Sequence, residues 1–386
     1  MKDFVYYTPT EVVFGHDSEK QIIPLLKKYN AGKVLIHYGG GSAIKSGLIP
    51  EIRKKLEDAF IPYVELGGVV PNPHLSLVYE GIDLCKASGV DFILAVGGGS
   101  VIDSAKAIAY GLEYNGDVWD FFDGKAKPAG AAPVGVVLTI PASGSEMSDS
   151  CVITNIEKGQ KRGCNSDFCR CKFAVMNPER TFSLPAYQSA CGITDIMMHS
   201  IERYFTPDSP MSITDALCSA LIKDVRITGE KLLEDPQNYD LRASIMWAGS
   251  LAHNGLTGCG VRSDFATHRL GHELSSLFDA AHGASLATLW CHWAKYVMSE
   301  NPSRFLSFAK DVMEVDTAEE GIDAMRSFFK RIGMPTSIPE LIGRKATQEE
   351  IALMAERCSR GRTISVGSFK PIEYSDMLKI YHLSNI

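Results

Sequence analysis

Two side chains that can bind a metal ion or exchange protons stand four residues apart in the segment GITDIMMHSIERY, residues 192–204. They are Asp195 and His199, and their neighbours are mostly apolar, with the periodicity of a buried helix. Four residues advance an α-helix by slightly more than one turn, so both side chains lie on one face and can reach a single atom. This geometry suits a metal ion. It also suits a direct hydrogen bond from the imidazole to the carboxylate, which is the commoner reason for such a pair.

More imidazoles follow in SDFATHRLGHELSSLFDAAHGASLA, residues 263–287. His268 and His272 repeat the four-residue spacing on a second predicted helix, and His282 stands where a further helix is predicted to begin. Burying several polar side chains without a common partner is costly, so we expect them to share one. A site made of one carboxylate and three imidazoles suits Fe(II) or Zn(II), and the residues that would form it are Asp195, His199, His268 and His282.

A run of glycines follows the strand-like segment DFILAV and precedes the helical segment VIDSAKAIA. Glycine lets the backbone approach a ligand closely, and the N–H groups at a helix N-terminus favour a phosphate. The run lacks the G-x-G-x-x-G pattern, so a tight strand-to-helix turn without a ligand stays an alternative. The residues concerned are Gly97, Gly98, Gly99 and Ser100.

Two further loops follow strand-like segments. In HYGGGSAIKSG no acidic residue stands where an adenosine ribose is usually bound, and Lys45 lies one turn further on. An acid there would repel a 2′-phosphate, so a dinucleotide ligand would be NADP(H) rather than NAD(H). The neutral positions are Gly39, Gly40, Gly41 and Ser42. The loop TIPASGSE adds hydroxyls at Thr139, Ser143 and Ser145, which suit either a ligand contact or a hydrogen-bonded loop.

The elements that position these groups differ between the two halves of the chain. Residues 33–37, 61–66, 91–96 and 134–141 have the pattern of short strands, separated by helical segments. This alternation predicts a parallel, Rossmann-like sheet with helices on both faces in residues 1–181. Residues 182–386 have helical periodicity throughout, which predicts an all-helical domain that carries the metal site. We expect ligands to bind in the cleft between the two domains.

Composition excludes several classes of protein. The chain has 386 residues, a net charge of −7 and dispersed basic residues, so no nucleic-acid partner is expected. No segment approaches the roughly 18 uncharged apolar residues of a membrane span, and MKDFVYYTPTEVVFG does not resemble a secretory signal, so a cytoplasmic protein with reduced thiols is expected. One cysteine cluster, Cys164, Cys169 and Cys171, could hold a soft metal, but it lacks both a nearby fourth ligand and C-x-x-C spacing.

Five motifs in one order and at characteristic separations give the chain a resemblance along its whole length. They are GGGSVIDSAK, TIPASGSE, GITDIMMHSIERY, FATHRLGHEL and AAHG. Together they resemble the iron-containing (group III) alcohol dehydrogenase family, in particular its butanol dehydrogenase branch of NADPH-dependent aldehyde reductases. The resemblance implies a metal-dependent enzyme that uses NADP(H) and acts on a small primary alcohol or aldehyde, such as butanol or butanal. It also implies a dehydroquinate synthase-like fold with the active site in the cleft between the two domains. A homodimer is implied as well, and an edge strand near residues 4–14 could pair in it.

The family's site residues carry over where this sequence matches its motifs. The resemblance assigns the metal ligands to Asp195, His199, His268 and His282, and a role in proton transfer or substrate positioning to His272. It places Asp103 near the nicotinamide, as a catalytic and cofactor-binding residue. The remaining implied cofactor contacts are the pyrophosphate loop Gly97, Gly98, Gly99 and Ser100, the 2′-phosphate segment Gly39 to Ser42, and Asn72, Thr139, Ser143, Ser145 and Lys161.

Some residues differ from the family's usual pattern, and three alternative functions can be set against this resemblance. Phe265 stands where close relatives often have Trp, Asn177 stands where Asp is common, and the cysteine cluster has no family role. Glycerol or polyol dehydrogenases of the same fold are an alternative, but they usually bind NAD(H) through a different ligand set. A non-redox metal hydrolase would leave the Gly97 loop unexplained, and a non-catalytic sensor would be expected to have lost its metal ligands.

Overall fold

The chain forms two compact units in the computed structural model, which describes the backbone of residues 1–386 and all side chains except that of Ser42. One unit comprises Tyr7–Ser183, and the other comprises Met1–Tyr6 together with Leu184–Ile386. The division expected from the sequence lies between residues 181 and 182. In the structure the boundary lies two residues later, between Ser183 and Leu184.

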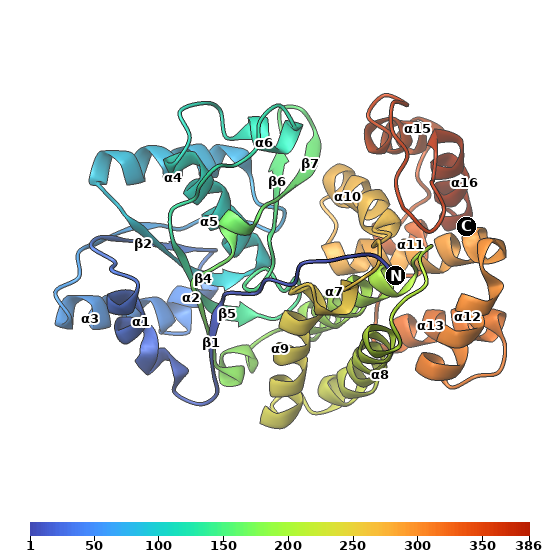
Figure 1. The fold of residues 1–386 in the computed structure, drawn as a ribbon, viewed down its shortest axis with the longest axis horizontal. Coiled ribbons are helices and arrows are strands. Elements are labelled where there is room, and N and C mark those ends of the chain that lie inside the picture. The colour runs from blue at the N-terminus through green and yellow to red at the C-terminus, as the bar shows by residue number, and fades with distance from the viewer. The chain divides into compact units, whose positions relative to one another are not determined.

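The first unit is built on a six-stranded parallel sheet with the order β1-β8-β5-β4-β2-β3. Figure 1 labels β1, β2, β4 and β5 of this sheet. An antiparallel hairpin, β6 and β7, follows the sheet's fifth strand in the chain. The strands are β1 Glu11–Phe14, β2 Val34–Tyr38, β3 Tyr63–Leu66, β4 Phe92–Gly98, β5 Val134–Ile140, β6 Ser150–Asn155, β7 Gln160–Asn165 and β8 Phe173–Met176. The helices are α1 Ile22–Lys28, α2 Ser42–Lys45, α3 Leu48–Asp58, α4 Leu75–Ser88, α5 Gly99–Leu112 and α6 Trp119–Asp123, with short 3-10 turns at Ser18–Gln21 (η1), Asp167–Cys169 (η2) and Pro178–Thr181 (η3).

Strand β2 explains why helices cover both faces of this sheet, as the alternation in the sequence predicts. Successive side chains of a strand point to opposite faces. Val34 and Ile36 pack in one apolar cluster with α1 and α3, whereas His37 points to the other face and reaches Ser104 on α5. Each face therefore has its own helical layer, and the period-2 pattern of the strand decides which side chain enters which layer.

The side chain of His37 connects β2 to β3 and to α5 by hydrogen bonds. It is fully buried, and its Nδ1 lies 2.9 Å from the Leu66 carbonyl oxygen on β3. A carbonyl only accepts, so Nδ1 carries the proton and Nε2 accepts from the Ser104 hydroxyl at 2.8 Å. Burial lowers the pKa of His37 from 6.5 to about 4, although the Leu66 bond opposes the shift. The imidazole is therefore neutral in the folded protein at neutral pH.

Acid should destabilise this unit through His37. The unfolded chain takes up a proton near pH 6.5 and the folded chain only near pH 4, so the neutral imidazole contributes fully above pH 6.5 and its contribution is lost as the pH falls towards 4. At 1.36 kcal/mol per pKa unit the loss amounts to about 3 kcal/mol. Urea unfolding at pH 7 and pH 4 measures it. His37→Gln should be less stable at pH 7 but should lack this part of the pH dependence, and an unchanged pH slope in the variant would contradict the assignment.

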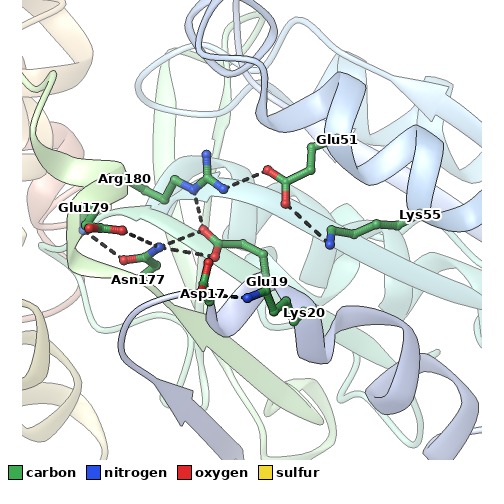
Figure 2. Close-up of a pocket in the computed structure, with 8 residues that line it drawn as sticks. All are labelled: Asp17, Glu19, Lys20, Glu51, Lys55, Asn177, Glu179 and Arg180. Atoms are coloured by element: carbon green, nitrogen blue, oxygen red, sulfur yellow. Dashed lines mark hydrogen bonds and ion pairs between the residues drawn. The ribbon is translucent and has the colours of Figure 1, made fainter.

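A polar pocket of about 280 Å³ opens beside the ends of β1 and β8, and its charged residues pair with one another (Figure 2). Glu19 is only 3% exposed and accepts hydrogen bonds from Arg180 and Asn177. Arg180 also donates to Glu51 at 2.8 Å. The amide of Asn177 donates to Glu179 as well, so an Asp at this position would set a third carboxylate against two others. This network gives a physical reason for the departure at Asn177.

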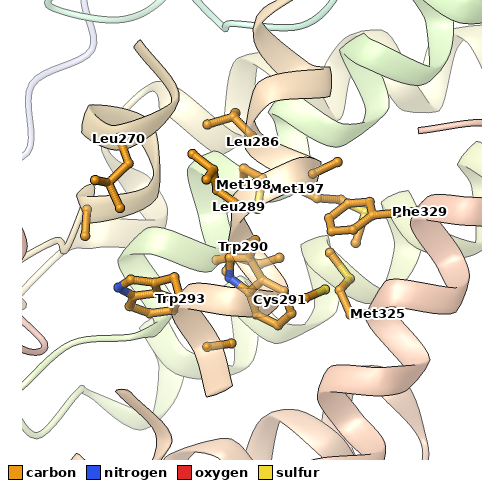
Figure 3. Close-up of a cluster of buried hydrophobic side chains, with 14 of the residues drawn as sticks. Met197, Met198, Leu270, Leu286, Leu289, Trp290, Cys291, Trp293, Met325 and Phe329 are labelled. Carbon is orange, nitrogen blue, oxygen red and sulfur yellow. The ribbon is translucent and has the colours of Figure 1, made fainter. Parts of the chain in front are cut away.

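The second unit is helical, as expected beyond residue 182, apart from an isolated bridge between Val366 and Ile372. Its core gathers Met197 and Met198 of α7, Trp290 and Trp293 of α11, and Phe329 of α13 (Figure 3). The longer helices are α7 Ala186–Tyr204, α8 Ser212–Glu234, α9 Tyr239–His253, α10 Ala266–Phe278, α11 His282–Val297, α12 Pro302–Phe308, α13 Ala318–Arg331, α14 Ile338–Ile342, α15 Gln348–Cys358 and α16 Tyr374–Ser384. No helix in the described part of the chain is both long and apolar enough to cross a membrane.

Candidate functional site

Three helices of the second unit bring the predicted metal ligands together. Asp195 and His199 lie one turn apart on α7, His268 lies in the first turn of α10, and His282 is the first residue of α11. The close approach of α11 to α7 depends on Gly283, because a Cβ at this position would lie 2.2 Å from the Cys191 carbonyl oxygen of α7. A glycine after His282 therefore permits the contact that carries this imidazole to Asp195.

The donor atoms converge on one carboxylate oxygen. Asp195 Oδ1 lies 3.5 Å from His199 Nδ1, 3.6 Å from His268 Nε2 and 3.7 Å from His282 Nε2. The donor atoms of Asp195, His268 and His282 all lie within 4.8 Å of one another, whereas His199 is close to Asp195 but is not part of this mutually close group. These separations are long for hydrogen bonds. Two ligand atoms that each lie about 2.1 Å from one tetrahedrally coordinated ion are about 3.4 Å apart, so the spacing fits a shared cation.

The buried nitrogens support the same fit. His199 and His268 are each 4% exposed, and among the described residues neither His199 Nδ1 nor His268 Nε2 has a hydrogen-bond partner. A buried ring nitrogen without a partner is costly unless an ion completes it. Burial and the neighbouring His253 lower the pKa of His199 well below 6.5, which keeps its lone pair available. Burial also disfavours the charged form of His268, but the carboxylates of Glu202 and Asp195 outweigh burial and raise its pKa to about 9.

Other aromatic side chains surround these ligands. The rings of His272 and His282 are 5.3 Å apart between centroids, so His272 lies beside the site, one turn after His268. His253, which the sequence analysis did not single out, lies with its ring 4.0 Å from that of His199. Phe265, the departure from Trp, has a left-handed backbone with φ of 57° at the start of α10, and its ring is 5.1 Å from that of His268.

The glycine run of the first unit lies where β4 passes into α5, as predicted. The strand ends at Gly98 and the helix begins at Gly99. A Cβ on Gly99 would lie 2.2 Å from the Ser143 hydroxyl, so a glycine is needed for this loop to meet the Thr139–Ser145 loop. The register of β4 with β5 shifts between Leu138 and Ile140, which leaves Thr139 at a bulge. Bulges commonly re-aim side chains near binding sites.

Asp103 and Lys106 on α5 hold the loop after β5 in place. The Asp103 carboxylate accepts from the Ser145 hydroxyl at 2.6 Å and from the Val152 amide at 3.0 Å, and burial raises its pKa. The fully buried Lys106 ammonium donates to the carbonyls of Ser145, Ser148 and Ser150 at 2.7, 3.0 and 2.9 Å. Lys106 was missed in the sequence analysis, although a lysine on the apolar face of a predicted helix could have identified it.

The remaining predicted cofactor residues fall into two places. Lys161 on β7 donates to the Asn72 side chain at 2.9 Å, so the structure joins two residues that are 89 positions apart. Gly39, Gly40 and Gly41 follow the end of β2. The Ser42 side chain lies outside the described part of the structure.

The cysteines of the cluster, Cys164, Cys169 and Cys171, are buried thiols in the first unit. Cys151 is the cross-strand partner of Cys164. Within the described residues, no three cysteine sulfurs lie within 4.8 Å of one another.

Comparison with protein-family models gives two matches. Residues 9–178 match the iron-containing alcohol dehydrogenase model, and residues 189–384 match the C-terminal model of the Fe-containing alcohol dehydrogenase family. The chain is 38% identical to probable NADH-dependent butanol dehydrogenase 1 of Bacillus subtilis, over 100% of both chains. It is 35% identical to the NADPH-dependent aldehyde reductase YqhD of Escherichia coli, over 88% of this chain and 89% of that protein.

Solved structures of a butanol dehydrogenase and of YqhD are similar to this chain. The NADH-dependent butanol dehydrogenase A of Thermotoga maritima is similar with a TM-score of 0.96 and 36% identity, over 100% of this chain and 99% of that one. YqhD of E. coli is similar with a TM-score of 0.92 and 31% identity, over 99% of both chains.

Proposed function

The chain belongs to the iron-containing alcohol dehydrogenase family, and from this premise we propose that it transfers hydride between NADP(H) and a small primary alcohol or aldehyde, such as butanol and butanal. The observation that carries the proposal is the convergence of three imidazole nitrogens, 3.5 to 3.7 Å away, on Asp195 Oδ1. In the proposal, Fe(II) or Zn(II) is bound there by Asp195, His199, His268 and His282.

Each group in the proposal has a physical role. When bound, the metal ion supplies Lewis acidity towards the substrate oxygen and the nicotinamide supplies the hydride. Burial of Asp195, His199 and His268 keeps water from these donors, which strengthens their electrostatic interactions. Asp103 acts by positioning the Ser145 loop, through the hydrogen bond between the two side chains. Gly97, Gly98, Gly99 and Ser100 present main-chain N–H groups to the pyrophosphate at the start of α5.

His272 is the proposed proton donor and acceptor. It is partly exposed and lies next to His282, so it can exchange protons with solvent while it stays near the metal site. In the reducing direction its imidazolium gives a proton to the product oxygen, and in the oxidising direction its neutral ring takes that proton back.

A direct assay tests the reaction. Protein purified without oxygen should oxidise NADPH in the presence of butanal, followed at the near-ultraviolet absorbance of the reduced cofactor. A chelator should abolish the activity, and Fe(II) or Zn(II) should restore it. Metal-loaded protein that turns over neither NADPH nor NADH with aldehydes would contradict the proposed reaction.

The preference for NADP(H) rests on the segment after β2. Tyr38 ends the strand and Gly39, Gly40 and Gly41 follow, so no carboxylate there opposes a 2′-phosphate. On the neighbouring strand β3, the Glu65 carboxylate accepts two hydrogen bonds from Arg53, of 2.7 and 2.6 Å. Named relatives use NADH in some cases and NADPH in others, so this preference is a proposal for this chain alone.

Gly40→Asp should reverse the preference. A Cβ at Gly40 has no neighbour within 4 Å, so a side chain fits without displacing the fold. We expect kcat/KM for NADPH to fall about 10-fold, because a new carboxylate near the 2′-phosphate costs on the order of 1 to 2 kcal/mol. The neutral Gly40→Asn is the matched control and should retain most of the NADPH activity. A wild-type enzyme that prefers NADH, or equal effects of Asp and Asn, would contradict the assignment.

Assembly and location complete the proposal. Strand β1 is at the edge of the six-stranded sheet, and Phe14 at its end is 39% exposed. We propose a homodimer in which the β1 edges of two copies pair, and the mass in solution tests it. All ten cysteines are free thiols, which suits the reducing cytoplasm.

A further inference from the structure

A buried carboxylate that belongs to none of the predicted sites lies behind the metal ligands. Glu202 has no exposed surface and lies on α7, seven residues after Asp195 and three after His199. These spacings place all three side chains on one face of the helix. A carboxylate with no access to water needs strong partners, and the structure supplies them from α10.

Both oxygens of Glu202 bind the same residue. Oε1 accepts from the His268 main-chain N–H at 3.0 Å, and Oε2 lies 2.7 Å from His268 Nδ1. A carboxylate only accepts, so Nδ1 carries the proton. The other ring nitrogen, Nε2, is the one that lies 3.6 Å from Asp195 Oδ1. The two contacts fix both the direction of the ring and the place of its proton.

We propose that Glu202 is a positioning residue that holds His268 with its proton on Nδ1 and with Nε2 directed at the metal ion. The inference rests on the proposed metal site and adds a residue to it. A metal-bound imidazole whose second N–H is held by a carboxylate is also a stronger ligand, and such partners contribute 10- to 100-fold to metal affinity.

Glu202→Gln is the discriminating variant. An amide of the same shape has one acceptor oxygen, yet it faces two N–H groups of His268. Its NH2 group must therefore oppose one of them, which either breaks the main-chain contact or moves the ring proton to Nε2 and blocks the metal. We expect the dissociation constant for Zn(II) to be 10- to 100-fold higher than in wild type, measured by competition with a chromophoric chelator. The visible absorption of Co(II)-loaded protein should also change, a signature that lowered stability alone would not give.

Glu273→Gln is the matched control. Glu273 is a second buried carboxylate, 7% exposed, but it lies on α10 and interacts electrostatically with Cys358 of α15 and Tyr381 of α16. Its neutralisation should leave the Zn(II) dissociation constant within about 3-fold of wild type, because both contacts of His268 remain. Glu202→Asp keeps two acceptor oxygens on a shorter side chain and should recover part of the affinity.

One measurement does not depend on variants that fold. Long-range ¹⁵N–¹H spectra of zinc-loaded wild-type protein with labelled histidine should show His268 protonated at Nδ1, and protonation at Nε2 would overturn the proposal. So would Glu202→Gln protein that binds Zn(II) as tightly as wild type. A wild type that binds no metal, or a His282→Ala variant with full affinity, would instead refute the metal site itself.

Discussion

Asp195→Ala is expected to abolish metal binding and to lower the rate of butanal reduction by about 1000-fold or more. Asp195 provides the oxygen on which three imidazoles converge and is the only carboxylate in the proposed ligand set. Its loss removes the negative charge that favours a divalent cation among neutral ligands. A Lewis acid contributes several kcal/mol to stabilising the charge that develops on the substrate oxygen, and about 4 kcal/mol corresponds to a factor of about 1000.

Metal content and turnover should be measured on the same protein samples. Asp323→Ala is the matched control, because this carboxylate is 61% exposed on the side chain and pairs with Lys295 at the surface. It should keep both its metal and its activity. Asp195→Ala protein that retains a full equivalent of metal and near-normal turnover would exclude Asp195 as a ligand. Folded protein without metal but with normal turnover would exclude metal catalysis.

Arg180→Met is expected to destabilise the protein by about 3 kcal/mol or more. Arg180 is the cationic partner of Glu19, which is 3% exposed, and its removal leaves that carboxylate buried with only amide partners. Breaking a buried ion pair by removing one partner typically costs about 3 to 5 kcal/mol, because the remaining charge is uncompensated. Urea unfolding followed by circular dichroism measures the change.

The double variant separates the pair from its surroundings. Glu19→Leu in the Arg180→Met background should recover much of the lost stability, because the uncompensated charge is gone. Arg344→Met is the surface control, because the arginine of its pair with Glu350 is 52% exposed, and its loss should leave the free energy of unfolding nearly unchanged. Equal losses in Arg180→Met and Arg344→Met would show that burial of Glu19 does not govern the effect.

Several elements of the first unit were predictable because their patterns are local. The apolar runs at residues 91–96 and 134–141 predicted β4 and β5, and the glycine run lies where β4 ends and α5 begins. The hairpin strand β7, with the sequence QKRGCN, was not predicted. Its residues are mostly polar, so its extended form depends on pairing with β6 rather than on its own hydrophobic pattern.

The sequence by itself determined which side chains share a helix face. Asp195 and His199 are four residues apart, and a helix of 3.6 residues per turn brings them together whatever surrounds it. The identity and spacing of the donors therefore predicted the chemistry of the site before any packing was known.

Only the tertiary structure decided which faces meet. The approach of α11 to α7 at Gly283 brings His282 to Asp195, and the packing of α10 on α7 sets Glu202 behind His268. Such contacts depend on the joint packing of residues far apart in the chain, because no local pattern specifies which helix lies opposite another. The candidate metal donors could thus be predicted as a set, whereas the carboxylate that contacts one of them became visible only in the folded chain.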